Sequence, residues 1–262
     1  MKDILEEIIA YKRIEVEMQQ QAFPSEILED HLTDAVPLKR SMRQALEQSA
    51  TGIIAEFKRR SPSKGWIKKD AKIEEIIPAY ERNGATALSI LTDTEFFGGS
   101  LRDIREARAL TNLPILRKDF IVSEYQLLQA KAVGADAVLL IAACLTPEAC
   151  RNLSRKAHEL DMEVLLEIHS EKELEYLNEE IDIVGVNNRN LGTFHTDVEN
   201  SLHLAELLPK DRVRISESGI SSAETMAKLR NAGFRGFLIG ETFMKTEHPA
   251  DALHRFIKGG TV

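Results

Sequence analysis

Apolar residues near the start of the chain recur at the spacing of a helix. The side chains that share this spacing are Ile4, Leu5, Ile8, Ile9 and Ile14. The pattern predicts a helix over residues 2–22, which Pro24 closes. A second short helix is predicted from Leu38 to Gln48. Residues 1–50 are therefore expected to form a helical extension that caps one end of the following domain.

From Gly52 onward the pattern becomes regular, with a short β-rich run, a loop and an amphipathic helix repeated to the end of the chain. The eight strand candidates begin at Ile53, Ala87, Ile115, Ala137, Glu163, Asp182, Val213 and Gly236. Gly-Ala pairs such as Gly84-Ala85 and Gly134-Ala135 mark helix ends between them. Strands that alternate with helices pair in parallel, and several of these strands are apolar on both faces.

Eight such units predict an α/β fold, a (β/α)8 TIM barrel with eight following helices. The alternative is a doubly wound open sheet, which is less favoured because no G-x-G-x-x-G motif follows the first strand. Neither a linker nor a composition shift interrupts the chain after residue 50. Residues 1–262 are therefore expected to form one barrel domain, with residues 1–50 as its N-terminal extension.

Composition excludes several classes of protein. The 262 residues are 43% hydrophobic and 29% charged, as in ordinary globular domains. A net charge of −8 argues against nucleic-acid or membrane-surface binding, although a small local anion site remains open. The charged N-terminus is unlike a signal peptide, so we expect a cytoplasmic protein. Cys144 and Cys150 lack metal-ligand spacing and are interpreted as reduced and structural, with thiol catalysis as the alternative.

Polar residues are concentrated where the predicted strands end. In a TIM barrel these positions surround one bowl, at the face where this fold does its chemistry. They are Glu56, Lys58, Ser61, Thr92, Lys118, Glu167, Asn187, Ser216, Glu217 and Ser218. Two lysines and three glutamates would converge there, in a space partly shielded from water. A buried charge is costly unless it is paired, and these acids and bases could nearly satisfy one another. A structural ion network at the barrel mouth is the alternative interpretation.

Lys118 is the best candidate for a general acid, since a lysine with a depressed pKa can donate a proton near neutral pH. The alternative is that Lys118 pairs with the neighbouring Asp119. Gly219, which precedes the N-cap candidates Ser221 and Ser222, and Gly240 follow the last two strands. The loops after these strands commonly bind phosphate in this fold, so a phosphorylated substrate is expected. Alternatively, each glycine is only a turn residue.

Two histidines and one basic loop are harder to interpret. His169 and His195 show no partner in the sequence and are interpreted as ordinary loop histidines. Trp66 lies in the first loop with Lys64, Lys68 and Lys69. This loop could be a mobile lid over the bowl or a solvated loop with one anchoring ring.

These stretches together resemble the indole-3-glycerol phosphate synthase family of tryptophan biosynthesis. The resemblance covers essentially the whole chain, in the order IIAEFKRRSPSKG, LRKDFIVSEYQ, GADAVLLIA, LLEIHSEKELE, VGVNNRNL, SESGI and FLIGETFM. It implies ring closure, decarboxylation and dehydration of 1-(2-carboxyphenylamino)-1-deoxyribulose 5-phosphate, with no cofactor or metal. It also implies a monofunctional enzyme, expected to be a monomer, for which association with other pathway enzymes stays open.

The resemblance assigns catalytic roles to six of these residues. Lys118 would be the general acid, Glu167 its partner for dehydration, and Asn187 would orient a substrate hydroxyl. Glu56 would hold Lys58 against the substrate carboxylate, and Glu217 would close the polar ring. The substrate-binding positions implied are Ser61, Ser218, Gly219, Gly240 and the backbone of Glu241 for the phosphate, Phe97, Phe120, Leu139 and Leu191 for the aromatic ring, and Arg189.

Two rival functions stay open. One is another barrel enzyme of sugar phosphates, such as an isomerase, or an aldolase that uses Lys118 or Lys58 as a Schiff-base nucleophile. The other is a catalytically silent sugar-phosphate-binding protein. The intact set of charged positions argues against this second rival.

Overall fold

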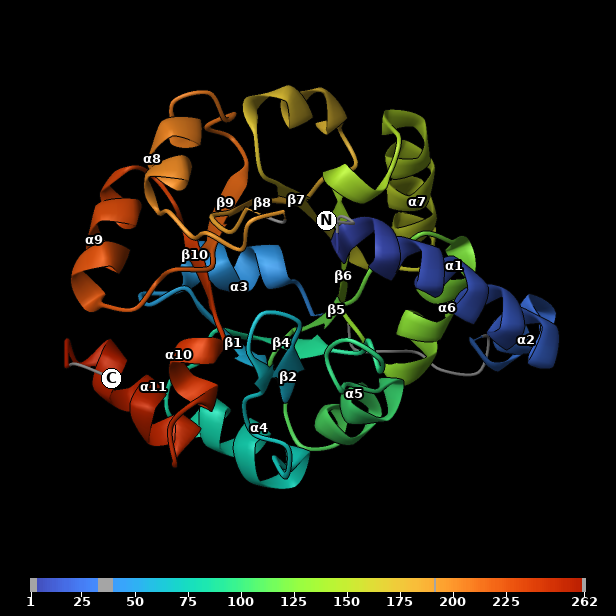
Figure 1. The fold of residues 1–262 in the computed structure, drawn as a ribbon, viewed down its shortest axis with the longest axis horizontal. Helices are drawn as coiled ribbons and strands as arrows, with labels where there is room; N and C mark the ends of the chain where they lie inside the picture. The colour runs from blue at the N-terminus through green and yellow to red at the C-terminus, as the bar shows by residue number, and fades with distance from the viewer. Residues whose placement is uncertain (1–3, 33–39, 191, 261–262) are drawn as a thin grey trace.

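The computed structural model describes residues 4–32, 40–190 and 192–260. Eight parallel strands close into a barrel in the order β1-β10-β9-β8-β7-β6-β5-β4 (Figure 1). They are β1 (Ile53–Phe57), β4 (Ala87–Leu91), β5 (Ile115–Lys118), β6 (Ala137–Ile141), β7 (Glu163–Ile168), β8 (Ile183–Asn187), β9 (Val213–Glu217) and β10 (Gly236–Ile239). The predicted TIM barrel is confirmed, and closure of the sheet rules out the doubly wound alternative.

Alternation along the strands explains how a layer of charged side chains lies beyond the apolar interior of the barrel. Outward residues of the strands pack with the surrounding helices in one large apolar cluster. The inward residues Ile54, Leu116, Leu165 and Ile215 form a second apolar cluster inside the barrel. Two positions later, side chains point the same way but sit one layer nearer the carboxyl ends. That layer holds Glu56, Lys118, Glu167 and Glu217.

The helices that surround the barrel follow the strands as predicted, with one exception. They are α4 (Ile73–Arg82), α5 (Leu101–Arg108), α6 (Glu124–Val133), α7 (Pro147–Glu159), α8 (Glu199–Ala205), α9 (Ala223–Asn231), α10 (Glu241–Met244) and α11 (Pro249–Ile257), with a short 3-10 helix η1 (Ala142–Cys144) before α7. The helix expected after β7 is instead the 3-10 helix η2 (Glu171–Tyr176). Leu174 and Leu177, three residues apart, pack on the core as a 3-10 period requires.

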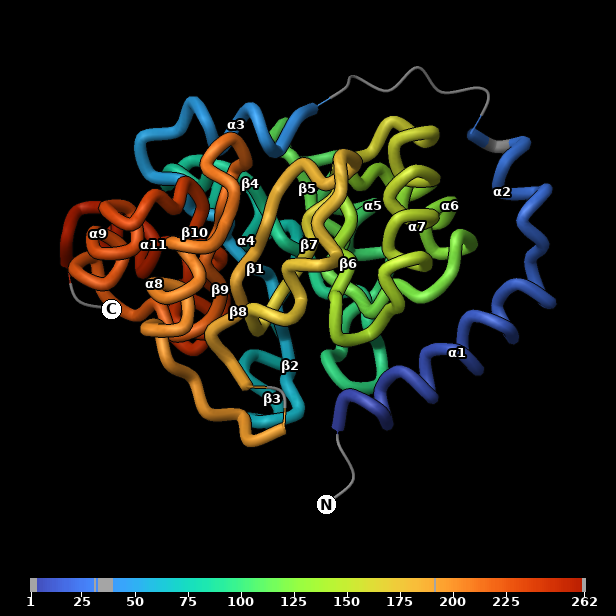
Figure 2. The backbone as a smooth tube through the Cα atoms, turned by 90° about the horizontal axis from the view of Figure 1, so that it is seen from above, coloured from blue at the N-terminus to red at the C-terminus, as the bar shows by residue number. Residues whose placement is uncertain are grey.

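The N-terminal extension contributes helices to both ends of the barrel. It forms α1 (Ile4–Ala22), α2 (Ser25–Leu32) and α3 (Met42–Gln48), of which α2 was not predicted. Met42 and Leu46 of α3 are fully buried among the inward strand residues, so α3 caps one end as expected. Residues 38 and 39 of the second predicted helix lie outside the described residues. Figure 2 shows α1 beginning at the end of the barrel opposite α3 and running outward to α2, and both α1 and α2 contact α6.

A buried ion cluster fastens α1 to the barrel. Lys12 is 2% exposed, and its Nζ lies 2.8 Å from Asp93 and 3.1 Å from Asp119. Glu15 of α1 completes the cluster at 2.6 Å. Asp93 and Asp119 follow β4 and β5, so α1 is held directly above two strand ends. No helix among the described residues is long and apolar enough to cross a membrane.

Candidate active site

A cavity of about 550 Å³ opens at the carboxyl ends of the strands. Its walls include every described residue to which the resemblance gave a role, namely Glu56, Lys58, Ser61, Phe97, Lys118, Phe120, Leu139, Glu167, Asn187, Arg189, Glu217, Ser218, Gly219, Gly240 and Glu241. Thr92 and Ser216, which were also expected at the bowl, do not line the cavity, because Thr92 bonds Asp119 and Ser216 bonds Asn188 and Ser201 instead. Leu191 lies outside the described residues. The structure thus brings together side chains from eight different segments, and their roles stay predictions.

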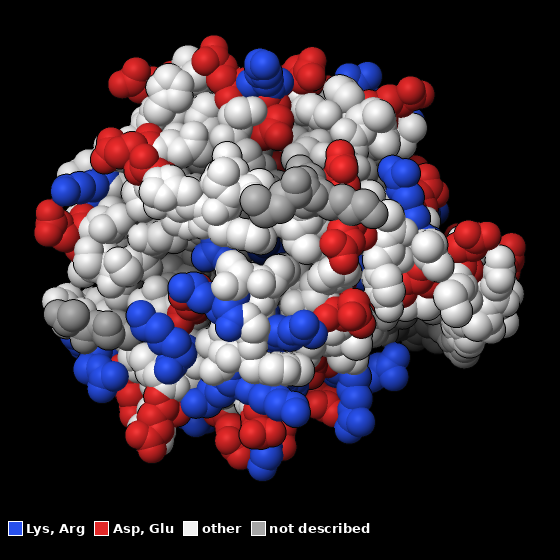
Figure 3. Space-filling model, in the orientation of Figure 1, with Lys and Arg blue, Asp and Glu red and all other residues white. Residues whose placement is uncertain are grey.

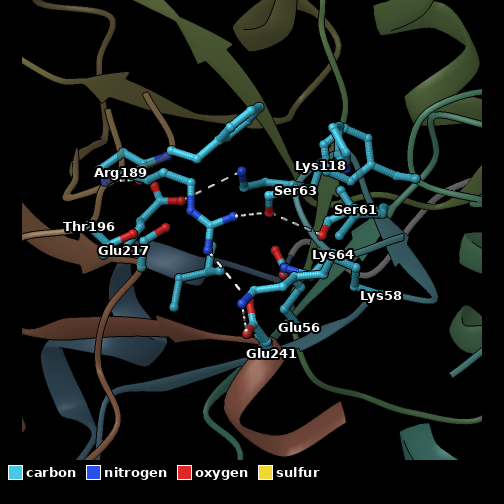
Figure 4. A pocket seen from close by; sticks show the side chains of 18 of the residues that line it. Glu56, Lys58, Ser61, Ser63, Lys64, Lys118, Arg189, Thr196, Glu217 and Glu241 are labelled. Carbon is cyan, nitrogen blue, oxygen red and sulfur yellow. Dashed lines mark hydrogen bonds and ion pairs between the residues drawn. The ribbon is translucent and has the colours of Figure 1, made fainter. Parts of the chain in front are cut away.

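Lys118 is the centre of the charged cluster. Its Nζ lies 3.3 Å from Glu167 Oε2 and 3.6 Å from Glu217 Oε2 (Figure 4). Burial favours a lower pKa, but the charges of Glu167, Glu217 and Glu56 outweigh burial and raise the pKa of Lys118 above its usual range. The predicted depression of this pKa was wrong, because the sequence did not show how closely the carboxylates approach. The raised pKa favours the protonated form of Lys118, which the neighbouring glutamates stabilise in the free enzyme.

The two glutamates beside Lys118 differ in protonation. Burial, followed by the charge of Glu167, raises the pKa of Glu217 to about 8. Burial opposes ionisation of Glu167 too, but Lys118 and hydrogen bonds lower the pKa of that carboxyl. Like charges this close do not both ionise, so near neutral pH Glu217 keeps its proton and hydrogen-bonds to Glu167.

Lys118 does not pair with its sequence neighbour. The Asp119 carboxylate points to the other side of the strand, where Arg117 lies 2.9 Å away and Lys12 3.1 Å away. Thr92 donates a hydrogen bond to it at 2.6 Å. Burial opposes ionisation of Asp119, but these partners lower its pKa to about 2. The alternative pairing is therefore ruled out, and Asp119 anchors α1.

Lys58 and Glu56 form the tightest ion pair of the cavity, with Nζ and Oε1 2.6 Å apart. Glu56 is 4% exposed, whereas Lys58 reaches toward the mouth. Gly240, after β10, makes room for this carboxylate. A Cβ at that position would lie 2.2 Å from Glu56 Oε1. The pairing of Glu56 with Lys58 follows the arrangement expected from the sequence.

The loop after β9 turns through two residues in the left-handed region. Ser218 and Gly219 both adopt positive φ angles, of 66° and 76°. A non-glycine residue with a positive φ angle is strained, so Ser218 needs support from its surroundings. Asn188 fixes this turn, since its side-chain amide donates to the Ser218 carbonyl at 3.0 Å and to Ser216 Oγ at 2.9 Å. Asn188 was missed in the sequence, where it follows Asn187 without a distinguishing signal.

Arg189 and Glu241 connect three loops across the mouth of the cavity. Arg189 donates to Ser63 Oγ at 3.0 Å, and its guanidinium lies 3.5 Å from the Glu241 carboxylate (Figure 4). Lys64 lies 4.0 Å from the same carboxylate. The first loop is thus linked to the loops after β8 and β10. It forms a small hairpin of β2 (Arg60–Ser61) and β3 (Gly65–Trp66), and its movement as a lid stays a prediction.

The remaining wall of the cavity is apolar. The rings of Phe97 and Phe120 lie 5.9 Å apart, centroid to centroid, and Leu139 lies inside the barrel below them. Helix α1 adds Ile4, Leu5 and Ile8 to this wall. The α1 residues were missed because a helix outside the eight repeating units gives no strand-end signal. Their apolar periodicity was read only as packing.

The structure corrects the interpretation of one histidine. His169 Nε2 lies 3.4 Å from Glu167 Oε1, and the side chain is largely buried. His169 therefore has the carboxylate partner that the sequence analysis did not find, although it stands two positions after Glu167. His195 lies in the exposed loop after β8, as expected. Among the described residues, no group of histidine, cysteine and acidic side chains is arranged to hold a metal ion.

Comparison with known proteins assigns the family. The family model described as indole-3-glycerol phosphate synthase matches residues 5–256. The chain is 64% identical to the indole-3-glycerol phosphate synthase of Bacteroides thetaiotaomicron, over 98% of this chain and 99% of that protein. It belongs to the indole-3-glycerol phosphate synthase family. The synthase of Burkholderia multivorans is 42% identical, over 97% of this chain and 99% of that protein.

As a member of this family, the protein is a carboxy-lyase of tryptophan biosynthesis with indole-3-glycerol phosphate synthase activity, as the resemblance implied. More distant solved structures share only the fold. A thiamine phosphate pyrophosphorylase from Pyrococcus furiosus matches with a TM-score of 0.60 and 17% identity, over 83% of this chain and 96% of that one. A tryptophan synthase α subunit from Legionella pneumophila matches with a TM-score of 0.60 and 14% identity, over 83% and 95%.

Proposed function

We propose that this synthase closes the indole ring with Lys118 as general acid and Glu167 as its partner in dehydration. The observation that carries the proposal is the ammonium of Lys118, held within 3.3 Å of Glu167 at the floor of a cavity with one apolar and one polar wall. A substrate with an aromatic acid at one end and a sugar phosphate at the other matches both walls.

The substrate is 1-(2-carboxyphenylamino)-1-deoxyribulose 5-phosphate. Its aromatic ring lies against Phe97, Phe120 and Leu139. Its phosphate accepts hydrogen bonds from the backbone N–H groups of Ser218 and Gly219 after β9, and of Gly240 and Glu241 after β10. The Ser61 hydroxyl lies opposite. Lys58 lies at the mouth between these two ends, where its charge meets the substrate carboxylate.

Ring closure joins the aromatic carbon that bears the carboxylate to the ketose carbonyl carbon. Lys118 donates its proton to the carbonyl oxygen as the bond forms, and the carboxylate leaves as carbon dioxide, with its electrons restoring the aromatic ring. Dehydration follows when Glu167 takes a ring proton and the hydroxyl leaves as water with a proton from Lys118. Asn187, which hydrogen-bonds to Glu167, orients that hydroxyl.

The Schiff-base rival is disfavoured by the protonation of Lys118. An amine attacks a carbonyl only when neutral, and the neighbouring glutamates, Glu167 above all, raise the pKa of Lys118. Borohydride added to enzyme and ketose phosphate tests this point. We expect no covalent capture, and inactivating capture on Lys118 or Lys58 would favour the aldolase.

We further propose that the chain acts as one domain over residues 1–262, as a cytoplasmic monomer, without cofactor or metal and without nucleic-acid or membrane partners. The chemistry above requires only proton transfer and fixed charges. Association with other enzymes of the pathway stays open. Sedimentation of the purified protein would test the monomer, which a larger species at working concentration would contradict.

Adding the carboxyphenylamino substrate to purified protein tests the function itself. We expect indole fluorescence to appear with steady-state kinetics between about pH 6 and pH 9. A silent binding protein would quench or shift substrate fluorescence without forming product. Absence of product over this whole range would overturn the proposed function.

A further inference from the structure

His169 lies directly after β7 and contacts the carboxylate that the proposed mechanism uses. Its Nε2 is 3.4 Å from Glu167 Oε1, while Glu167 Oε2 is 3.3 Å from Lys118 Nζ. Each oxygen of this carboxylate therefore has its own nitrogen neighbour. Glu167 is 2% exposed, so these neighbours control how protons reach it.

The second ring nitrogen of His169 faces another carboxylate. Nδ1 lies 3.8 Å from Glu173 Oε2, at the start of η2. That carboxylate is fixed by the backbone N–H groups of His169 and Ser170, the latter at 3.0 Å. Both ring nitrogens are shielded from solvent, and neither makes a hydrogen bond to any described residue. Glu167, His169 and Glu173 thus form a row.

This row leads to a second cavity, of about 800 Å³, between α1 and the loops after β6, β7 and β8. His169 and Glu173 line this second cavity and not the active-site cavity, whereas Lys118 and Glu167 line only the active-site cavity. Polar residues of its walls include Glu6, Arg13, Asn200 and His195, and Asn187 and Arg189 line both cavities. A polar space of this size holds water.

The reaction consumes one proton for each turnover. This step rests on the proposed function. Replacing a carboxylate by a carbon–carbon bond and releasing carbon dioxide removes one negative charge. Ring closure therefore takes a proton from Lys118, which stays on the hydroxyl of the intermediate until that hydroxyl leaves as water. Dehydration then uses one proton and releases one. Lys118 must therefore recover from water the proton that it lost in ring closure, while the bound substrate covers this lysine.

We propose that His169 relays this proton from the second cavity to the buried pair of Glu167 and Lys118. Glu173, whose carboxylate lines the second cavity, takes a proton from water there and passes it to Nδ1, which is itself shielded from solvent. Nε2 passes its proton to Glu167 Oε1, the carboxyl group rotates so that this proton faces Lys118, and neutral Lys118 takes it. His169 ends neutral and regains its starting tautomer by turning its ring, Glu167 and Glu173 end ionised, and one proton has moved from water to lysine, leaving hydroxide in the second cavity.

The charged groups around the ring fit this role. Glu167 of β7 and Glu173 of η2 flank it, and Lys118 of β5 lies beyond Glu167. Glu6 and Arg13 of α1 line the cavity opposite. Asn200 of α8 donates to the His169 carbonyl at 3.1 Å and so fixes the backbone without occupying either ring nitrogen.

The test uses His169→Ala in the full chain, with His195→Ala as the matched control in the same cavity. We expect kcat of H169A to fall at least about tenfold, with KM for the substrate nearly unchanged. Imidazole buffer should restore kcat in proportion to its concentration, because the removed side chain leaves space beside the second cavity. H195A should keep wild-type kcat, and imidazole should not change this value.

Three outcomes would overturn the relay. They are wild-type kcat in H169A, loss that imidazole does not restore, or equal loss in H195A. Circular dichroism and melting of H169A and of His169→Asn separate loss of fold from loss of turnover. Glu167→Gln distinguishes the two proposals, since inactive E167Q beside fully active H169A rejects only the relay, whereas fully active E167Q rejects the proposed role of Glu167.

Discussion

Two glycines determine how closely the carboxylates of the active site approach their partners. A Cβ at Gly185 would lie 2.5 Å from Glu217 Oε1, and a Cβ at Gly240 would lie 2.2 Å from Glu56 Oε1. Neither glycine has a positive φ angle, so space and not backbone conformation requires glycine at these positions. The charged cluster therefore requires that Gly185 and Gly240 have no side chain.

Gly240→Ala should displace Glu56 from Lys58. We expect kcat/KM to fall roughly 10²-fold, because small displacements of a positioned charge are costly, with a smaller effect on melting temperature. Gly192→Ala is the control, since among the described residues its Cβ would meet only Asn190 Oδ1, at 3.6 Å. Steady-state kinetics of both variants test this, and equal activity in G240A and wild type would show that the pair of Glu56 and Lys58 is structural.

Glu217→Gln should change how stability depends on pH. Burial and the charge of Glu167 raise the pKa of Glu217 from 4.5 to about 8 in the folded protein. The folded state then holds a proton that the unfolded chain releases, so the free energy of unfolding falls as pH rises from about 4.5 to about 8. E217Q lacks this loss, and its stability relative to wild type should increase across that range. Urea denaturation at several pH values measures the difference, and a constant difference would reject the raised pKa.

Strand-end position predicted most of the residues that meet, although not Thr92 and Ser216, which stay outside the cavity, and it did not predict their protonation. Lys118, Glu167 and Glu217 could be placed together because inward positions repeat every second residue. The shift in the pKa of Lys118 was predicted in the wrong direction. The direction depends on how close the neighbouring glutamates lie to Lys118, and no sequence pattern encodes those distances. His169 was set aside for the same reason, because its carboxylate partners are visible only once β7 and η2 are placed.

Helix α1 is an element that both holds and completes the active site. Its buried Lys12 joins the strand ends of β4 and β5, and its apolar residues line the cavity. The periodicity of residues 2–22 predicted the helix itself. It did not reveal α2, a single short amphipathic segment after Pro24, nor that η2 would replace a full helix, because both depend on packing against the barrel.

Lys12→Met should weaken the docking of α1. The change leaves Asp93 buried without its cation, and we expect a loss of about 3 kcal/mol in the free energy of unfolding. Ile14→Ala on the same helix is the control, because Ile14 is 59% exposed and its truncation should cost little. Denaturant titration measures both, and a loss in K12M no larger than in I14A would contradict this function of the ion cluster.

The molecule as a whole is acidic, yet its active-site face is not. Figure 3 shows Lys and Arg side chains gathered around the mouth of the cavity on a chain with a net charge of −8. Lys58, Lys64, Arg189 and Lys245 line the cavity itself. Net charge argues against a general polyanion surface, but it could not show this local concentration, because residues from separate loops produce it.

Salt should therefore slow capture of the anionic substrate. We expect kcat/KM to fall roughly tenfold between about 20 mM and 500 mM salt, with kcat less affected, since screening acts on encounter. Lys64→Gln should reduce this dependence, whereas Lys228→Gln on the distant α9 should not. Initial rates at low substrate concentration across this range measure the effect, and a salt-independent kcat/KM would contradict it.

The central claim is that Lys118, held as an ammonium by its carboxylates, delivers the proton for ring closure. Rapid mixing of Lys118→Ala with the carboxyphenylamino substrate, followed by quenching and separation of substrate and product, tests it most directly. We expect the variant to bind substrate with near-normal affinity and to form product at least about 10²-fold more slowly than wild type. Product formation at a near-normal rate would contradict the account.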